Sequence, residues 1–343
     1  GGAILLFLYN AEQLLGLFAG LFGRLGRLLP VARVSIAYPV AAKGRTAITL
    51  AMFSLVVFTL VSTTTITNTF SNFLNSETGS GGYDVLLQSN PFNPIGSEEM
   101  AATIDRLADE GAIAEPAAFA SAVFAPVEAQ SPNMSRPAAY AINGVDEAFF
   151  ASQQLELAGI ADGYEDEQAV WSALQSDPSL VVIDNFSVDR TGDPTFQADG
   201  DSFSISSIAA SDSQFEPVTI QIAGADGQAR SFTVIGLIGS APSFFGAMMN
   251  SEAAAGLGFG DSNRYFLRLP EGVEARPVAN ALESEFNRSG LQTTLLKEQL
   301  EASQQSVRSI FYLIQGFIGL GLLIGIAALG VITIRAVVER RQQ

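Results

Sequence analysis

The side chains that could carry chemistry in this sequence are carboxylates and hydroxyls. Its 343 residues include no His and no Cys. These absences exclude an imidazole base, a thiolate nucleophile, a disulfide and a zinc site built from the usual ligands. Catalysis by carboxylates or by a Ser–Lys pair remains, so a membrane-anchored hydrolase of that kind is one alternative for the function.

Acidic residues gather at two places in the sequence. One group is Glu165, Asp166 and Glu167, and the other is Asp199 with Asp201. Neither has the alternating ligands and central glycine of an EF-hand calcium loop. Carboxylate pairs for glycoside hydrolysis assemble in three dimensions, so spacing neither predicts nor excludes them. Because charged side chains lie mostly in solvent, we interpret both groups as surface and predict no metal, no cofactor and no catalytic residue.

Two long apolar runs predict where the chain crosses a membrane. Thr46–Ile66 has 21 residues and Phe311–Ile334 has 24, and neither contains a charged residue. About 20 such residues span the hydrocarbon core of a bilayer, so both are predicted to be transmembrane helices. A third run, Ala3–Gly23, carries Glu12 near its middle. A charge there is costly in lipid, so this run is either a span packed against other helices or an interfacial helix.

Basic residues close to these runs predict the orientation, since Lys and Arg are retained on the cytoplasmic side. They are Arg24, Arg27, Arg33, Lys43 and Arg45 before the first span, and Arg335, Arg340 and Arg341 after the last. Residues 67–307 are then extracytoplasmic, and they hold 9 basic and 33 acidic residues, a net charge of −24. Such acidity argues against binding to nucleic acid, which needs positive charge.

Residues 67–307 have the pattern of an α+β domain. The helical spacing of Met100, Ile104 and Leu107 predicts a helix over Ser97–Ile113 with Ser97 as its N-cap. A second helix is predicted over Pro277–Phe286, with its proline in the first turn. We also predict that Trp171 belongs to the core. Strands are predicted between turn sequences at Tyr83–Gln88, Ser121–Ala125, Ala138–Ile142, Leu180–Ile183, Val218–Ile222, Phe232–Ile238 and Tyr265–Leu269.

The two segments that connect this domain to the apolar runs differ in predicted stiffness. Before it, the cluster Gly79–Gly82 (GSGG) is typical of a flexible joint. After it, no proline interrupts residues 295–342, which predicts a single helix about 72 Å long. That is more than twice the thickness of a bilayer core. The polar first part, Lys297–Val307, is therefore a candidate stalk outside the membrane.

Small residues mark one face of the last apolar run. Gly321 and Gly325 form a Gly-x-x-x-Gly pair, and Ala328 continues the face. Small residues let two membrane helices approach closely, so these three are candidates for helix packing in an assembly. Glycine is also common in membrane helices generally, and that interpretation stays open.

The predicted fold class is thus α-helical transmembrane segments flanking a large α+β extracytoplasmic domain. In chain order the parts are a transmembrane or interfacial helix at 1–23, a cytoplasmic basic linker at 24–45, a transmembrane helix at 46–66, the extracytoplasmic domain with its stalk at 67–307, a transmembrane helix at 308–335 and a cytoplasmic segment at 336–343. We expect the chain to be a fragment of a longer protein.

Five segments resemble a known family. Arg33–Val61 is similar to the juxtamembrane segment and span that open the second half of FtsX-like, MacB-type ABC transporter permeases. Gly319–Gln343 resembles the family's span after the outer domain, with its Arg-rich exit. Gly81–Val85, Val181–Asp184 and Ser231–Ile238 are similar to strands of the family's MacB-like periplasmic core domain. The family's closing pair of spans has no counterpart in this sequence.

The resemblance implies a permease subunit that is not an enzyme and works with a separate ABC ATPase subunit, which binds the ATP. It also implies a multi-pass protein of the inner or plasma membrane, in contact with lipid, and a dimer or pseudo-dimer of permease halves. Members act in export, in lipid or lipoprotein handling and in mechanical signalling to outer partners. The alternative is a sensory receptor with its ligand-binding domain between two spans. A receptor of this kind does not account well for the additional apolar run before Arg24.

Overall fold

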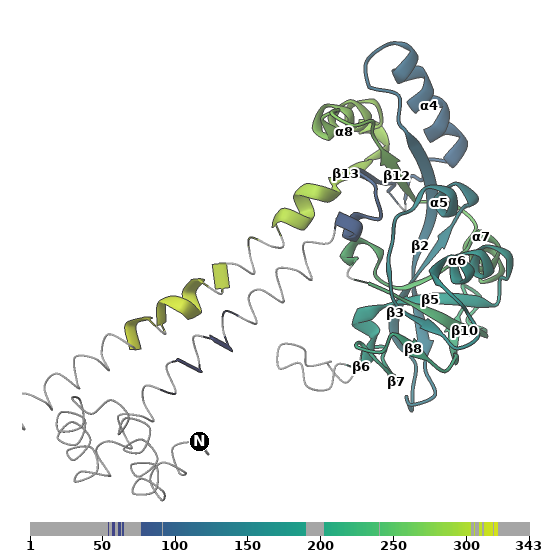
Figure 1. The fold of residues 1–343 in the computed structure, drawn as a ribbon. Coiled ribbons are helices and arrows are strands. Elements are labelled where there is room, and N and C mark those ends of the chain that lie inside the picture. The colour runs from purple at the N-terminus through teal and green to yellow at the C-terminus, as the bar shows by residue number, and fades with distance from the viewer. Residues whose placement is uncertain are drawn as a thin grey trace, which may run out of the picture. The chain divides into compact units, whose positions relative to one another are not determined.

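A computed structural model describes residues 77–90, 92–189, 202–239 and 241–302, with further helical residues scattered between 54 and 64 and between 305 and 321. The chain divides into two compact units, Gly1–Ser71 with Gln305–Gln343, and Asn72–Gln304. The second contains every strand described below, and we call it the α+β unit (Figure 1). The predicted spans 46–66 and 308–335 lie mostly outside the described residues. Among the helices that the structure does describe, none is long and apolar enough to cross a bilayer.

The first lobe of the α+β unit is assembled from the two ends of its chain segment. Its elements are β1 (Val85–Gln88), α4 (Ser97–Asp109), the start of β2 (Ala118–Gln130), β12 (Arg264–Arg268), α8 (Ala275–Glu285) and β13 (Gln292–Leu295). The strands lie in the order β13-β1-β12-β2, and all neighbours are antiparallel. This is the split βαβ topology of ferredoxin-like folds, and we call it the βαββαβ lobe.

The core of the βαββαβ lobe lies between its sheet and the helices α4 and α8. Leu87 of β1 and Tyr265 of β12 point to the same face, because paired residues of neighbouring strands share a face. They form one hydrophobic cluster with Met100 of α4 and Leu282 of α8, and all four are 0% exposed. α4 and α8 therefore pack on this face of the sheet and shield its apolar side chains from water.

The second lobe is inserted between β2 and β12 and closes into a barrel. Its pairings run from β2 to β3 (Ala138–Val145), β11 (Ala247–Asn250), β5 (Leu180–Asp184), β10 (Ala229–Ile238), β9 (Val218–Ala223) and back to β2. The closing step is short, since β9 pairs with β2 at Ala129 and Gln130. Closure pairs the edges that an open sheet would expose. We call this part the barrel lobe.

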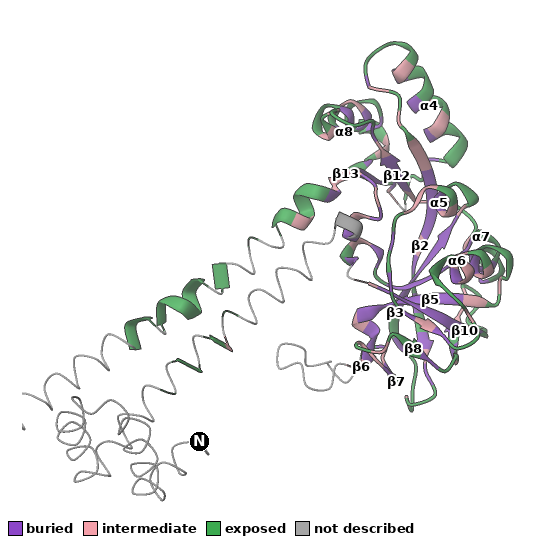
Figure 2. Ribbon diagram, viewed as in Figure 1, coloured by how far each residue is buried: buried purple, intermediate pink, exposed green. Residues whose placement is uncertain are grey.

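Smaller elements surround the barrel lobe. They are the helices α5 (Glu147–Ser152), α6 (Glu167–Ser176) and α7 (Ser251–Gly256), the strands β4 (Leu157–Ala161), β6 (Val188–Asp189), β7 (Ile205–Ala209) and β8 (Gln214–Phe215), and the 3-10 turns η2 (Asn185–Ser187) and η3 (Pro242–Phe244). Two further turns, η1 (Glu77–Ser80) and η4 (Asn287–Ser289), precede β1 and β13. The strands are largely buried while the helices expose their outer sides (Figure 2).

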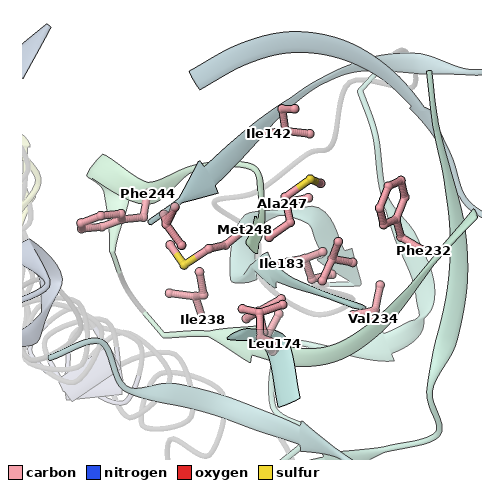
Figure 3. Packing of buried hydrophobic residues seen from close by; sticks show 14 of the residues in the cluster. Ile142, Leu174, Ile183, Phe232, Val234, Ile238, Phe244, Ala247 and Met248 are labelled. Atoms are coloured by element: carbon pink, nitrogen blue, oxygen red, sulfur yellow. The ribbon is translucent and has the colours of Figure 1, made fainter. Parts of the chain in front are cut away.

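A large hydrophobic cluster fills much of the interior of the barrel lobe (Figure 3). Ile183 from β5, Met248 from β11 and Val234 from β10 are each 0% exposed, and Leu174 of α6 packs with them. Burying a side chain of this size stabilises a fold by roughly 1.5–3 kcal/mol. The α+β class predicted for residues 67–307 is confirmed in the described part of the chain.

The predicted helices are present with shifted ends. α4 buries Met100, Ile104 and Leu107 as their spacing predicts, but its N-cap is Gly96, and Ser97 lies inside the helix. The second helix begins two residues before Pro277, which still falls in the first turn. Every predicted strand overlaps an observed one, whereas β4, β6, β7, β8, β11 and β13 were not predicted.

The lone tryptophan does not lie inside the core. Trp171 in α6 is partly buried and packs against the main cluster from outside. The apolar neighbours Val170 and Leu174, which are each 0% exposed, take the inward face of the helix instead.

Candidate functional site

The chain enters and leaves the α+β unit through neighbouring strands. β1 and β13 pair antiparallel, with Val85 opposite Leu295. The pairing continues one step further, because the N–H of Leu296 donates to the carbonyl of Asp84 at 3.0 Å. Residues 296–302, directly after β13, are helical. Both connecting segments therefore meet the α+β unit at one place, which we call the junction (residues 79–84 and 295–302).

The Gly/Ser cluster of the junction is a well-defined turn, so the flexible joint predicted from its composition is wrong. Gly81 and Gly82 have φ of +64° and +79°, a region that glycine adopts readily. The N–H of Gln154 donates to the carbonyl of Gly81 at 2.9 Å. A Cβ on Gly81 would stand 3.0 Å from the ring of Phe244. Glycine is required here for the backbone conformation and for close packing, and it does not make the segment flexible.

Arg268 joins the incoming segment to both lobes. It is the last residue of β12 in the βαββαβ lobe, and its Nε donates to the carbonyl of Gly82 at 2.6 Å. Its Nη2 donates to the carbonyl of Ser152, at the end of α5 beside the barrel lobe. Ser152 also shares a 2.8 Å hydrogen bond with the hydroxyl of Tyr83. The planar guanidinium, with its fixed set of donors, thus holds three chain segments together.

Four aromatic rings pack around the junction. Tyr83 of the incoming segment lies 5.2 Å from Phe266 of β12, measured between ring centroids, and Phe266 lies 5.2 Å from Phe244 of η3. Phe149 of α5 lies 5.7 Å from Phe244. Burial raises the pKa of Tyr83 to about 12, against the lowering effects of its bond to Ser152 and of the Arg268 charge. The phenol is therefore neutral, and Tyr83 attaches the incoming segment of the junction to the core.

The predicted acidic cluster has structural roles. Asp166 caps α6, since its Oδ1 accepts from the N–H of Ala169 at 2.8 Å. Glu167 accepts from the N–H of Leu157 at 3.1 Å. Within the described ranges, no group of His, Cys, Asp and Glu is arranged to hold a metal ion. The other predicted group, at 199 and 201, lies outside the described residues.

Most residues predicted to set topology and helix packing also lie outside the described part of the chain. This holds for Arg24, Arg27, Arg33, Lys43, Arg45, Gly325, Ala328, Arg335, Arg340 and Arg341. Gly321 is helical and exposed, and a Cβ there would meet no atom within 4 Å. The packing face and the orientation therefore stay predictions.

Sequence reasoning did not single out Arg268 or the rings of the junction. The available signal was alternation along β12, where Arg264, Phe266 and Arg268 share the face that α4 and α8 leave uncovered. The residues that Arg268 binds, Ser152 and Gly82, are 116 and 186 positions away in the sequence. No local pattern reports contacts over such separations.

Three solved structures are similar to this chain. The extracellular domain of the noncanonic ABC-type transporter YknZ from Gram-positive bacteria has a TM-score of 0.33 and 10% identity, covering 62% of this chain and 98% of that one. The periplasmic region of MacB from Actinobacillus actinomycetemcomitans has a TM-score of 0.34 and 12% identity, covering 69% and 98%. A domain of a protein described as a permease from Porphyromonas gingivalis has a TM-score of 0.31 and 12% identity, covering 63% and 89%.

No protein-family model and no curated protein matches the chain. The resemblance seen in the sequence is to MacB-type ABC transporter permeases, and the structural neighbours include MacB and an ABC-type transporter. Likeness at these identities and TM-scores assigns neither an activity nor a partner to this chain.

Proposed function

We propose that this chain is part of the permease subunit of an ABC transporter, and that it passes ATPase-driven motion to the α+β unit for export or for lipid or lipoprotein handling. The junction carries this proposal. Both connecting segments join neighbouring strands there, and Arg268 ties the incoming one to both lobes. A displacement of either segment then acts on the backbone of the sheet, because residues 79–84 and 295–302 lead directly into the paired strands and are held there by hydrogen bonds.

Exposed apolar side chains on helical residues of the two predicted spans support a membrane location for those spans. Phe58 is 69% exposed, and Leu313 and Phe317 are 65% and 74% exposed. Large apolar side chains on an exposed helix are favourable in lipid and unfavourable in water. We therefore infer that 46–66 and 308–335 cross the inner or plasma membrane and that 67–307 is extracytoplasmic.

The proposal includes specific partners. ATP is bound and hydrolysed by a separate ABC ATPase subunit, and this chain is not an enzyme. Two permease halves form a dimer or pseudo-dimer, for which Gly321, Gly325 and Ala328 are the candidate packing face. Membrane lipid surrounds the spans. Nucleic acid is not a partner, because the net charge of −24 on residues 67–307 repels it.

An insertion that uncouples the stalk tests the proposal. The coding sequence is first read past Gln343 and across the adjacent gene, where the proposal expects an ABC ATPase. The permease chain is then co-expressed with that ATPase, and a flexible Gly/Ser segment is inserted after Ser303. We expect co-purification and ATP hydrolysis to persist while the transport-dependent growth phenotype is lost. The same insertion after Gly227, in the turn between β9 and β10, is the matched control and should preserve both. Full transport after the Ser303 insertion would contradict the proposal.

The absence of cysteine makes the orientation directly testable. Single cysteines are introduced at exposed Ser284 in α8 and at Ala42 in the basic linker. A membrane-impermeant maleimide added to intact cells should label Ser284→Cys and leave Ala42→Cys unlabelled until the cells are opened. The reverse pattern overturns the orientation. A cytoplasmic helical signalling module encoded after the last span would instead favour the sensory receptor.

A further inference from the structure

The sequence contains three Asn-x-Ser motifs, the acceptor pattern of N-linked glycosylation. They begin at Asn133, Asn185 and Asn287, and the middle residue of each is not proline. So short a motif also occurs by chance, and it has meaning only where the asparagine lies on an accessible extracytoplasmic surface. All three lie within residues 67–307, which we infer to be extracytoplasmic. Their surroundings in the fold differ and decide between them.

Two of the three motifs already have structural roles. Asn185 in η2 is 6% exposed, and the hydroxyl of Ser187, the third residue of its motif, donates to the buried Asp184 at 2.9 Å. Asn133 is exposed, but its Nδ2 donates to the carbonyl of Ser204 at 3.4 Å. An acceptor asparagine needs a side-chain nitrogen that is accessible and not engaged elsewhere. Neither of these asparagines meets both conditions.

Asn287 meets both conditions. It is exposed and begins η4, the turn between α8 and β13, in which no residue is buried. Among the residues that the structure describes, neither the carboxamide of Asn287 nor the hydroxyl of Ser289 has a hydrogen-bond partner. The turn is held by its backbone, since the N–H of Ser289 donates to the carbonyl of Phe286 at 2.9 Å. A bulky group on Asn287 would therefore displace no packed side chain.

We propose that Asn287 is a site of N-linked glycosylation. The inference rests on the extracytoplasmic location of residues 67–307 in the proposed function. The sugar donor is an oligosaccharide on a lipid phosphate carrier, and a membrane-bound oligosaccharyltransferase of the host catalyses the transfer. The Nδ2 of Asn287 bonds to the anomeric carbon of the sugar, and the bond from that carbon to the phosphate oxygen breaks. The lipid phosphate leaves with the bonding electrons, and Nδ2 releases one proton.

Peptide mass spectrometry tests the site on the full-length protein, purified from the membranes of its native host. Cleavage after glutamate releases Phe286–Glu298, in which Asn287 is the only asparagine. We expect this peptide to carry the added mass of one oligosaccharide, and the peptides that contain Asn133 and Asn185 to have the mass of the polypeptide alone. Finding Phe286–Glu298 only in its unmodified form would overturn the proposal.

Matched variants decide whether Asn287 and its motif carry the modification. Asn287→Gln removes the acceptor and Ser289→Ala removes the hydroxyl of the motif, so each should abolish the added mass. Ser289→Thr keeps a hydroxyl and should retain the modification. Asn133→Gln, at the other exposed motif, is the control and should leave the modification unchanged. A glycan that persists in Asn287→Gln would lie elsewhere in the protein and contradict the proposal.

Labelling of Ser284→Cys separates failure of this proposal from failure of the proposed function. Ser284 is an exposed residue of α8 close to Asn287 in the sequence. If the impermeant maleimide labels this cysteine in intact cells while Asn287 is unmodified, the orientation holds and glycosylation is overturned. If the cysteine is labelled only after the cells are opened, the orientation is wrong, and glycosylation at Asn287 is overturned with it.

Discussion

The two lobes of the α+β unit bury their interiors differently. The core of the βαββαβ lobe is almost entirely apolar, and charged side chains such as Arg106, paired with Glu110 and Glu285, stay at its surface. The barrel lobe encloses polar groups, including Asp184, which is 2% exposed. An apolar core accepts many similar packings, whereas a satisfied buried polar network favours one arrangement. We infer that polar contacts restrict the packing of the barrel lobe more than that of the βαββαβ lobe.

Asp184 is the centre of a buried hydrogen-bond network in the barrel lobe. At the end of β5, its Oδ2 accepts from the hydroxyl of Tyr140 at 2.7 Å, the hydroxyl of Ser187 at 2.9 Å and the N–H of Gly246 at 3.1 Å. Its Oδ1 accepts from the N–H of Phe186 at 2.8 Å. Burial raises the pKa of this carboxyl despite the four bonds, which act to lower it. The side chain thus fixes β3, β5 and the approach to β11 relative to one another.

The largest effect is expected where the lobes meet. Phe266 is 1% exposed and packs against rings from both lobes. Phe266→Ala should lower the free energy of unfolding by about 3–5 kcal/mol, because it removes a large buried ring and leaves a cavity. Urea unfolding measures it. The control Phe92→Ala, at a phenylalanine that is 97% exposed, should stay within about 0.5 kcal/mol of the wild type.

Core truncation in each lobe tests whether the lobes respond separately. Leu282→Ala in α8 and Ile183→Ala in β5 each remove a side chain that is 0% exposed, so each should lower the free energy of unfolding by about 2–5 kcal/mol. Hydrogen exchange should speed up mainly in β1, β12 and β13 for the first and in the barrel strands for the second. If either variant speeds up hydrogen exchange equally in both lobes, the lobes do not respond separately.

The buried carboxyl predicts a characteristic pH dependence. Asp184→Asn places an amide N–H₂ among hydrogen-bond donors and should lower the free energy of unfolding by about 1–3 kcal/mol. Because the pKa of Asp184 is raised from 3.8 in the folded state, its stabilising contribution is complete below that value and declines as pH rises through the folded pKa. The difference between wild type and variant should therefore shrink from about pH 4 toward neutral. A constant difference across a urea-unfolding pH series would argue against this account.

The smallest effect is expected at the surface of the βαββαβ lobe. Arg106 bridges α4 and α8 through a 2.5 Å contact with Glu285, but both side chains are more than 40% exposed. Exposed pairs of this kind contribute little and are screened by salt. Arg106→Gln should shift the melting temperature slightly at low salt and not at all in high salt. A large shift that persists in high salt would mean that this lobe also depends on a specific polar contact.

The limits of prediction from sequence are clearest in β2. The pattern predicted a strand over Ser121–Ala125, but β2 runs from Ala118 to Gln130. Pro126 lacks an N–H and argues against a central strand. In the fold it falls where β3 is the only described strand that pairs with β2, because β12 pairs only as far as Ala122 and the pairing with β9 starts at Ala129. Only the arrangement of the other strands makes that proline acceptable.

The candidate site was predictable only in part. The glycines before β1 were recognised as a special position, but their composition suggested slack, and only their contacts with Gln154 and Phe244 show a fixed turn. Arg264 and Arg268 are identical residues four positions apart in one strand. Arg268 binds carbonyl groups of distant segments, whereas Arg264 has a buried Nε with no hydrogen-bond partner among the described residues.

The sequence by itself determined the local features of this protein: the helix that buries Met100, Ile104 and Leu107, the position of seven strands, the acidity of residues 67–307 and the two uncharged apolar runs. These follow from periodicity and composition, which neighbouring residues carry among themselves. The tertiary structure alone decided the insertion of a closed barrel between β2 and β12, the burial of Asp184 and the attachment of Gly82 through Arg268. Those features depend on contacts between residues far apart in the chain, whose partners are fixed only when the whole domain packs.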